Sequence, residues 1–540
     1  MAPMFHKAPS SASAPEPAQA VWGHMNWSLL LLTLGLTAVL QVLVAGRSGL
    51  WADEVFSLAL ATGHSLEHAA AVADPRHGDF VEPNHPVPAA EFSRYLKHES
   101  PPANPARVVR AVLLSDTNPP LYYLLLYGWT IVLGTSDIAL RLFSIVCALA
   151  CLPLLAAIAR RTGADVFSSC VLFAFSPLGI YYSTEGRMYS LLWLCVLATT
   201  WASLILQQRS EGIAIYTVWI AASVAGFLTH YFFVFPWLAI VAYLSIAPGK
   251  LTKLKLAVCL LLTVILILPW YIKIPESLAA WRITKDWLKW RPPGFYRWIA
   301  SLDLVVQPFS GGDYRSSNTA AIILFGLIGI AMVSRLRIQV FGNHRLLLWL
   351  SFTAACVGPL AFDLVQHTYT VAVPRYAVAA LPLAYLLAGV GLGCLSRYTR
   401  FVMLILIILA WAPTVLGIYR SGWRGWSPLR EISRAACVNA GPSDLILIHS
   451  IPSGVLGIAR YANDSAGLAS WVGQLGRRRV PEAMHELVSG RTRIVFVKVH
   501  EVGEPAPEER WLRGNAVVFD DMDVGSGKIV EFRPRGEKTF

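Results

Sequence analysis

The chain has 540 residues, of which 55% are hydrophobic and only 14% are charged, and its mean hydropathy is +0.52. Soluble globular proteins carry about a quarter charged residues, so this composition excludes that class and predicts a polytopic membrane protein. The net charge of +12 could suit nucleic acid, but much of it lies in short loops between apolar segments, where the positive-inside rule explains it. We therefore expect a lipid bilayer and no nucleic acid as partners.

Residues 1–26 are rich in Pro, Ala and Ser, which predicts a disordered N-terminus on the cytoplasmic side. The eight cysteines show neither metal-ligand spacing nor a disulfide pattern and are expected to be small core residues. Apolar segments then recur through a transmembrane domain at 27–420, at residues 27–46, 119–135, 138–159, 165–183, 187–206, 213–229, 231–247, 255–272, 319–334, 345–362, 375–396 and 401–419.

The basic loops orient these segments. Arg160-Arg161, Lys250–Lys255, Arg335–Arg345 and Arg397–Arg400 all belong on the cytoplasmic side. They fit together if residues 119–159 make one net crossing, with 119–135 re-entrant or lying along the membrane surface. The sequence thus predicts eleven crossings, with thirteen as the alternative, and places the loop 47–118 and the C-terminus outside.

Residues 421–540 have the composition of a soluble domain. Asp444–His449 and Arg493–Lys498 are predicted to be buried strands with helical sequence between them, and residues 527–533 are a possible third strand. A small extracytoplasmic α/β domain follows. It has no Gly-rich phosphate loop and no nucleophile elbow, so modulation, substrate docking and stability all remain open as its role.

The predicted topology gathers on one membrane face the residues that look out of place in such a chain. They are Asp53 and Glu54; Asp116, Asn118, Pro119 and Pro120; Glu185, Arg187 and Tyr189; His230 and Tyr231; and Arg375 and Tyr376. Ionisable residues near membrane depth generally mark function. A carboxylate would act as general base toward an acceptor hydroxyl, and arginines would hold a phosphate. Aromatic side chains suit a sugar face or a lipid chain.

Each group also has a simpler explanation. Asp53 and Glu54 fit the first turn of a helix near Phe56, where acidic residues are favoured. Glu185 and Arg187 fit an exposed turn, and Arg375 fits a snorkelling residue. His230 has no partner at ligand spacing, so an interfacial histidine is favoured over a metal ligand.

The order and spacing of these groups resemble the GT-C membrane glycosyltransferases of the family 39-like group, which includes protein O-mannosyltransferases, aminoarabinose transferases and rhizobial galacturonic acid transferases. The resemblance covers most of residues 45–400. It rests on Trp51-Ala-Asp53-Glu54, Thr117-Asn-Pro-Pro-Leu-Tyr-Tyr123, Asp137-Ile-Ala-Leu-Arg141-Leu-Phe-Ser144, Ser176-Pro-Leu-Gly-Ile-Tyr-Tyr-Ser183-Thr-Glu185-Gly-Arg187-Met-Tyr189, Thr229-His230-Tyr231-Phe232, Leu268-Pro-Trp270 and Arg375-Tyr376-Ala-Val-Ala-Ala-Leu-Pro382.

The resemblance implies inverting transfer of a sugar from a polyprenyl-phosphate donor to a hydroxyl on a glycolipid, a polysaccharide or a protein. It implies Asp53 as the base with Glu54 beside it, and Glu185, Arg187 and Tyr189 around the donor. Arg375, Tyr376, His230, Tyr231 and Asn118 are further substrate-binding candidates. No cofactor and no obligatory metal are expected.

Two features depart from the family pattern. Asn118 stands where many relatives have His, which excludes an imidazole there, and Gly186 replaces the usual Ala. The long first loop carries scattered histidines and is expected to be an acceptor-specific insertion: His64, His68, His77, His85 and His98.

Three other functions remain as alternatives: a transporter or flippase of lipid-linked sugars, a catalytically inactive relative, and an oligosaccharide ligase or polymerase. Transporters place charges at the midplane on paired repeats, and neither feature is evident in this sequence. A bacterial inner membrane with the active site outside is the expected location.

Overall fold

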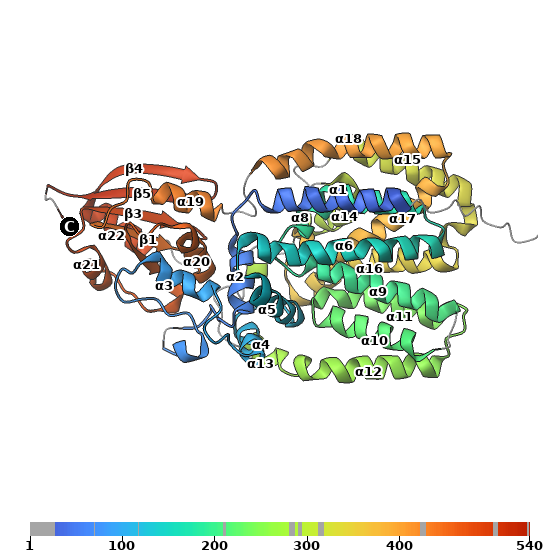
Figure 1. The fold of residues 1–540 in the computed structure, drawn as a ribbon, viewed down its shortest axis with the longest axis horizontal. Helices are drawn as coiled ribbons and strands as arrows, with labels where there is room; N and C mark the ends of the chain where they lie inside the picture. Colours follow the sequence, from blue (N-terminus) through green and yellow to red (C-terminus); the bar gives the residue numbers. More distant parts are fainter. Residues whose placement is uncertain are drawn as a thin grey trace, which may run out of the picture.

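The computed structural model describes residues 27–69, 71–116, 118–208, 212–279, 287–289, 294–311, 318–421, 428–500, 506–536 and 539–540. The disorder expected for residues 1–26 lies outside them. The chain forms a long helical bundle with an α/β domain at one end (Figure 1).

Among the described residues, seven helices are long and apolar enough to cross a membrane. They are α1 (Trp27–Ala45), α6 (Asp137–Thr162), α9 (Tyr189–Gln208), α12 (Lys253–Tyr271), α15 (Thr319–Leu336), α16 (Asn343–Gln366) and α18 (Arg397–Ser421). The pair α7 (Val166–Phe175) and α8 (Pro177–Ser183), bent by 62°, raises the number to eight if it is one span.

Four shorter apolar helices complete the predicted segments: α5 (Leu121–Leu133), α10 (Ile213–Phe227), α11 (Val234–Ile246) and α17 (Leu381–Gly393). Figure 1 shows α10 and α11 running along the bundle between α9 and α12, whereas α5 lies at the bundle end. At 1.5 Å per residue α5 is about 20 Å long, shorter than the roughly 30 Å hydrocarbon core. Its place at the end of the bundle agrees with the non-crossing role predicted for 119–135, and the total of eleven crossings stays a prediction.

The segment predicted as a helix at 375–396 begins differently. Three turns of 3-10 helix, η6 (Thr370–Ala372), η7 (Pro374–Tyr376) and η8 (Val378–Ala380), precede α17. Pro374 lacks an N–H and disfavours helical geometry in the residue before it, so the chain enters the helix late. Arg375 therefore lies in an irregular segment at the bundle end rather than in a helix.

Further helices lie in the first loop and between the apolar helices of the bundle. The loop after α1 contains α2 (Ala52–Ala61), η1 (Pro75–His77), α3 (Ala89–Ser93), η2 (Arg94–Leu96) and α4 (Pro105–Ser115). The others are η3 (Tyr231–Phe233), α13 (Ile274–Ala279), η4 (Trp287–Lys289), α14 (Tyr296–Ser310), which the sequence did not predict, and η5 (Arg337–Phe341).

The C-terminal domain has a five-stranded sheet in the order β2-β1-β3-β5-β4. Its elements are α19 (Leu429–Ala436), β1 (Asp444–His449), α20 (Pro452–Tyr461), β2 (Gly467–Trp471), η9 (Gly473–Leu475), α21 (Glu482–Val488), β3 (Arg493–Lys498), α22 (Pro507–Asn515), β4 (Ala516–Val524) and β5 (Gly527–Pro534).

The two predicted strands are confirmed as β1 and β3, and the possible third as β5. Both β1 and β3 are apolar and buried, whereas β4 is exposed along most of its length and carries no burial signal in its sequence. Strand β1 pairs in parallel with β2 and β3, and β5 joins antiparallel to β3.

The first loop packs on this domain. Val87 pairs antiparallel with Leu468 of β2, and Glu82 accepts the Val472 N–H at 2.9 Å. Arg478 donates to the carbonyls of Ser470 and Pro83, so its side chain joins the two parts.

Candidate active site

Asp53 lies in the first turn of α2, where the bundle meets the C-terminal domain (Figure 1). Its Oδ2 accepts a hydrogen bond from Arg375 Nη1 at 2.7 Å, and its side chain keeps 30% of its exposure. Arg375 is therefore the ion-pair partner of Asp53 and not a snorkelling residue. A carboxylate that is paired and still accessible can act on a substrate.

Arg187 approaches the same turn of α2 from the segment before α9. Its Nη1 donates to Ser57 Oγ at 3.1 Å, to Tyr123 Oη at 3.2 Å and to the Asp53 carbonyl at 3.4 Å. Its Nε has no hydrogen-bond partner among the described residues, although the side chain is only 8% exposed. Because buried guanidinium groups normally use their donors, this leftover N–H suits an anionic ligand.

The predicted turn 185–187 is buried rather than exposed. Glu185 is 1% exposed and Arg187 is 6% exposed, which excludes the solvent-exposed turn. Gly186 lies against Leu140, and a Cβ there would come within 2.6 Å of Leu140 Cγ. The glycine that departs from the family pattern thus permits this close approach.

Asp116 is a second carboxylate near Arg187, and these two residues with Asp53 and Arg375 are called the cluster below. It accepts a hydrogen bond from Tyr123 Oη, and its Oδ2 lies 3.8 Å from Arg187 Nη1. Asn118 donates to Asp116 Oδ1 through its backbone N–H and its side-chain amide, at 3.2 and 3.0 Å. The structure thus places Asn118 as a partner of Asp116.

Aromatic rings form one side of the cluster. Tyr189 stacks edge-on against Tyr182 at 5.0 Å between centroids and lies 6.3 Å from His230. The Arg375 guanidinium lies 5.8 Å from the centroid of Tyr376, whose ring is 6.4 Å from that of His230.

His230 and Tyr231 have separate surroundings. His230 Nδ1 accepts the Phe232 N–H at 3.1 Å, so the imidazole caps η3. Tyr231 packs on α12, where its hydroxyl accepts from Trp270 Nε1 at 3.3 Å and its ring meets Tyr271. Of this pair, His230 is the one whose ring contacts Tyr189 and Tyr376.

Glu54 has different surroundings from its neighbour Asp53. It is fully buried and forms a two-pronged ion pair with Arg141, at 2.7 Å from Nε and 2.5 Å from Nη2. It also accepts the Gly186 N–H at 2.8 Å and the Trp51 N–H at 3.3 Å. The Glu54 carboxylate thus caps α2 and is surrounded by protein donors, and the catalytic role expected for Glu54 stays a prediction.

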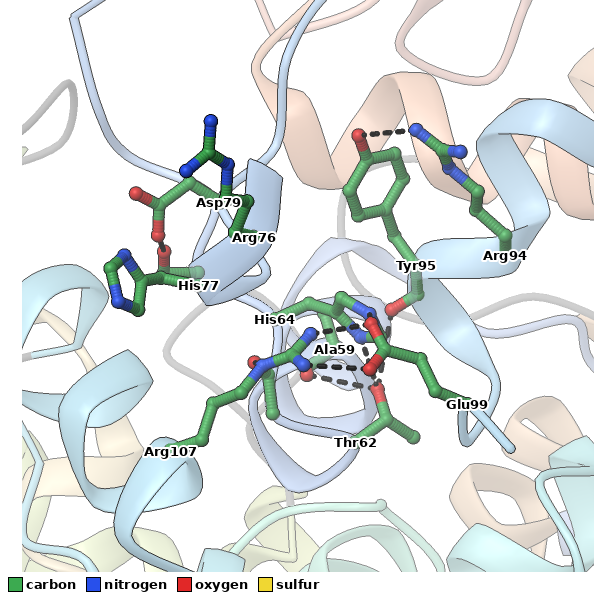
Figure 2. A network of polar contacts seen from close by, with 12 residues as sticks. Ala59, Thr62, His64, Arg76, His77, Asp79, Arg94, Tyr95, Glu99 and Arg107 are labelled. Atoms are coloured by element: carbon green, nitrogen blue, oxygen red, sulfur yellow. Dashed lines mark hydrogen bonds and ion pairs between the residues drawn. The ribbon is translucent and has the colours of Figure 1, made fainter. Parts of the chain in front are cut away.

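The first loop contains its own polar network (Figure 2). Arg107 donates to both oxygens of Glu99 at 2.6 and 2.7 Å, and His64 Nε2 lies 3.4 Å from the same carboxylate. Burial, with a smaller effect from Arg107, lowers the pKa of His64 to about 4. His64 is therefore neutral at physiological pH.

A second network in this loop joins Asp79 to Ser65, His68 and Arg110. Burial opposes ionisation of Asp79, but hydrogen bonds from these three side chains together hold its pKa well below its usual range. Within the described ranges, no group of three or more His, Cys, Asp or Glu side chains could hold a metal ion. His64 and His68 each contact a carboxylate of the same loop.

Comparisons with known proteins bear on the fold. Residues 117–272 match the family model described as dolichyl-phosphate-mannose-protein mannosyltransferase. A sequence search of the curated proteins found no match.

Solved structures extend the similarity over nearly the whole chain. ArnT from Cupriavidus metallidurans bound to undecaprenyl phosphate aligns with a TM-score of 0.57 at 12% identity, over 94% of this chain and 98% of ArnT. Its apo form aligns with a TM-score of 0.52 at the same identity and coverage. The chain has the GT-C glycosyltransferase fold. The resemblance predicted from the motifs is confirmed, and these matches support a GT-C glycosyltransferase in a multi-pass membrane protein over a transporter or flippase.

Sequence reasoning gave no role to three residues of this candidate site. Arg141 was quoted in a motif without a role, although a buried arginine in a membrane helix signals a partner. Asp116 was placed on the correct face, but nothing local indicated its contact with Arg187. Tyr123 likewise appeared only in a motif.

Proposed function

We propose that this chain is an inverting glycosyltransferase that moves a sugar from a polyprenyl-phosphate donor to an acceptor hydroxyl at the outer membrane face. The observation that carries the proposal is the Asp53 carboxylate, 30% exposed and held by Arg375 at 2.7 Å, with Arg187 beside the same turn. The ArnT neighbour bound to undecaprenyl phosphate and the family model named for a dolichyl-phosphate sugar support a lipid-phosphate donor.

In this mechanism Asp53 accepts the proton of the acceptor hydroxyl. The hydroxyl oxygen forms a bond to the anomeric carbon while the bond from that carbon to the phosphate oxygen breaks, with inversion. The electron pair leaves with polyprenyl phosphate. Arg375 and Arg187 neutralise the charge that grows on this leaving group, as preorganised cations do in other phosphate-releasing enzymes.

We assign Glu185, Tyr189, His230 and Tyr376 to the walls of the donor pocket. All four lie in or next to the segments that present the two arginines, and the rings of Tyr189, His230 and Tyr376 lie near one another. Stacked rings suit the apolar face of a sugar. We propose a structural role for Asn118 through Asp116.

The acceptor is a hydroxyl of a glycolipid, a polysaccharide or a protein. We place the site and the C-terminal domain outside a bacterial inner membrane, because the basic loops lie at the opposite end of the helices.

The test is transfer by the purified protein, in detergent with native lipids, from a panel of radiolabelled polyprenyl-phosphate sugars. Asp53→Asn should lower transfer by about 10²–10⁴-fold, the usual contribution of a general base, while undecaprenyl phosphate still binds. Asp523→Asn, the same change on the exposed strand β4, is the matched control and should leave transfer unchanged. Normal transfer by Asp53→Asn would remove Asp53 as the base, and no transfer by the wild type from any donor would favour a non-catalytic partner.

A further inference from the structure

The C-terminal domain forms hydrogen bonds with the chain segment that leads into α2. Tyr461, at the end of α20, accepts the Leu50 N–H at 2.6 Å and donates to Asp137 Oδ2 at 2.5 Å. Arg460 donates to Asp137 Oδ1 at 2.8 Å and to the Thr135 carbonyl at 2.7 Å. The end of α20 is thus tied both to the start of α6 and to the residues just before Asp53.

The same segment is held from its other side by α6. Arg141 Nη1 donates to the carbonyls of Ala45 and Ser48, and Nη2 donates to that of Gly49. With the two bonds to Glu54, all five N–H groups of Arg141 are used.

Close packing leaves the segment little freedom. A Cβ on Gly49 would lie 2.6 Å from Arg430 Cβ and 3.2 Å from the Tyr461 ring. Farther along, a Cβ on Gly457 would lie 3.2 Å from Val55 Cγ2, so α20 rests directly on α2. The contact between the two domains therefore runs along the element that carries Asp53.

His500 of the C-terminal domain is partly buried near the end of β1. His500 follows β3, and its Nδ1 lies 3.3 Å from Ser450 Oγ at the end of β1. Burial lowers the pKa of His500 to about 4, with a smaller opposing effect from the Asp53 carboxylate. The imidazole is thus neutral and within electrostatic reach of the proposed base.

We infer that Tyr461 and Arg460 of the C-terminal domain are positioning residues for Asp53. They fix the segment before α2 so that the carboxylate meets Arg375 and the incoming hydroxyl in one geometry. This inference rests on the proposed function. It gives the domain a part in catalysis in addition to its own stability.

The rest of the interface can hold the domain without these two residues. Glu82, Val87 and Arg478 join the first loop to β2 and its neighbours, away from the 45–51 segment. Loss of the Tyr461 hydroxyl should therefore loosen the segment without releasing the domain.

The first test is Tyr461→Phe in the full chain. Misplacement of a reacting group by about 1 Å can cost about 100-fold in rate, so we expect kcat to fall roughly 10- to 100-fold. KM for the donor should stay within about twofold, because Arg187 and Arg375 are untouched. The matched control is Arg478→Ala, which cuts contacts at the same interface but away from α2 and should leave kcat unchanged.

A charge exchange gives a sharper test of the pair. Arg460→Asp and Asp137→Arg should each lower kcat, and the double variant should recover part of it by restoring an ion pair. The inference would be overturned if kcat fell equally in Tyr461→Phe and Arg478→Ala, or if kcat did not change in Tyr461→Phe.

Hydrogen–deuterium exchange of residues 45–54 provides a readout that does not depend on activity. Exchange should rise in Tyr461→Phe and stay at the wild-type level in Arg478→Ala. A wild type that transfers no sugar would refute the proposed function alone, whereas unchanged exchange in Tyr461→Phe would refute the positioning role alone.

Discussion

Replacement of Arg141 by Met tests whether the buried ion pair holds the segment that leads into α2. The change leaves the Glu54 carboxylate buried without its cation, which costs about 3–5 kcal/mol. The carbonyls of Ala45, Ser48 and Gly49 also lose their donor, at about 1 kcal/mol each. Since these terms are not fully additive, we expect a loss of at least about 4 kcal/mol, a large share of a typical stability of about 5–15 kcal/mol.

The assay is thermal unfolding in detergent, followed by the reaction of buried thiols with a fluorescent dye. The bundle supplies the reporters, because Cys147, Cys151, Cys170 and Cys195 are free and buried. Arg397→Met, the same substitution at an exposed position, should change stability by less than about 0.5 kcal/mol.

Glu54→Gln distinguishes a stabilising role of Glu54 from a catalytic one. An amide cannot accept both guanidinium bonds, so we expect a lower unfolding temperature together with lower transfer. The reasoning is refuted if Arg141→Met unfolds like the wild type, or if Glu54→Gln keeps full stability and still loses transfer. The second result would support a catalytic role for Glu54.

Three further predictions follow from the structure. Arg375→Ala should lower kcat/KM for the donor by about 100-fold or more in the transfer assay, and Arg375→Gln should behave alike because the cation is what matters. Burial raises the pKa of Glu82 to about 7 from 4.5, so its contribution to stability is full below pH 4.5 and is lost as pH rises through about 7. Between pH 5 and 8 the free energy of unfolding of the wild type should therefore fall by up to about 3 kcal/mol more than that of Glu82→Gln. Thermal unfolding across this pH range is the measurement, and an equal fall in the two proteins would contradict the assignment. Asp363 accepts hydrogen bonds from Thr368, Thr370 and the Val371 N–H within the segment that leads to Arg375, so Asp363→Ala should lower transfer and raise hydrogen exchange there.

Local sequence patterns predicted the parts of the fold that depend on composition. The apolar runs predicted the helices, because a membrane-spanning helix must be continuously apolar over its own residues. The alternating charge of the loops placed Asp53, Arg187 and Arg375 at one end of the bundle, where the structure also brings them together. The buried strands β1 and β3 were recognisable for the same local reason.

Pairings between distant residues required the tertiary structure. Asp53 and Glu54 are neighbours in sequence, but successive residues on a helix point in different directions, so one meets Arg375 at a partly exposed site and the other meets Arg141 in the core. No local pattern distinguishes them. The contact of Tyr461 with Leu50 is equally invisible in the sequence, since it depends on how α20 packs against α2. The sequence by itself thus determined which residues are candidates for the site, whereas side-chain packing decided which of the two carboxylates stays partly exposed, because that depends on partners far away along the chain.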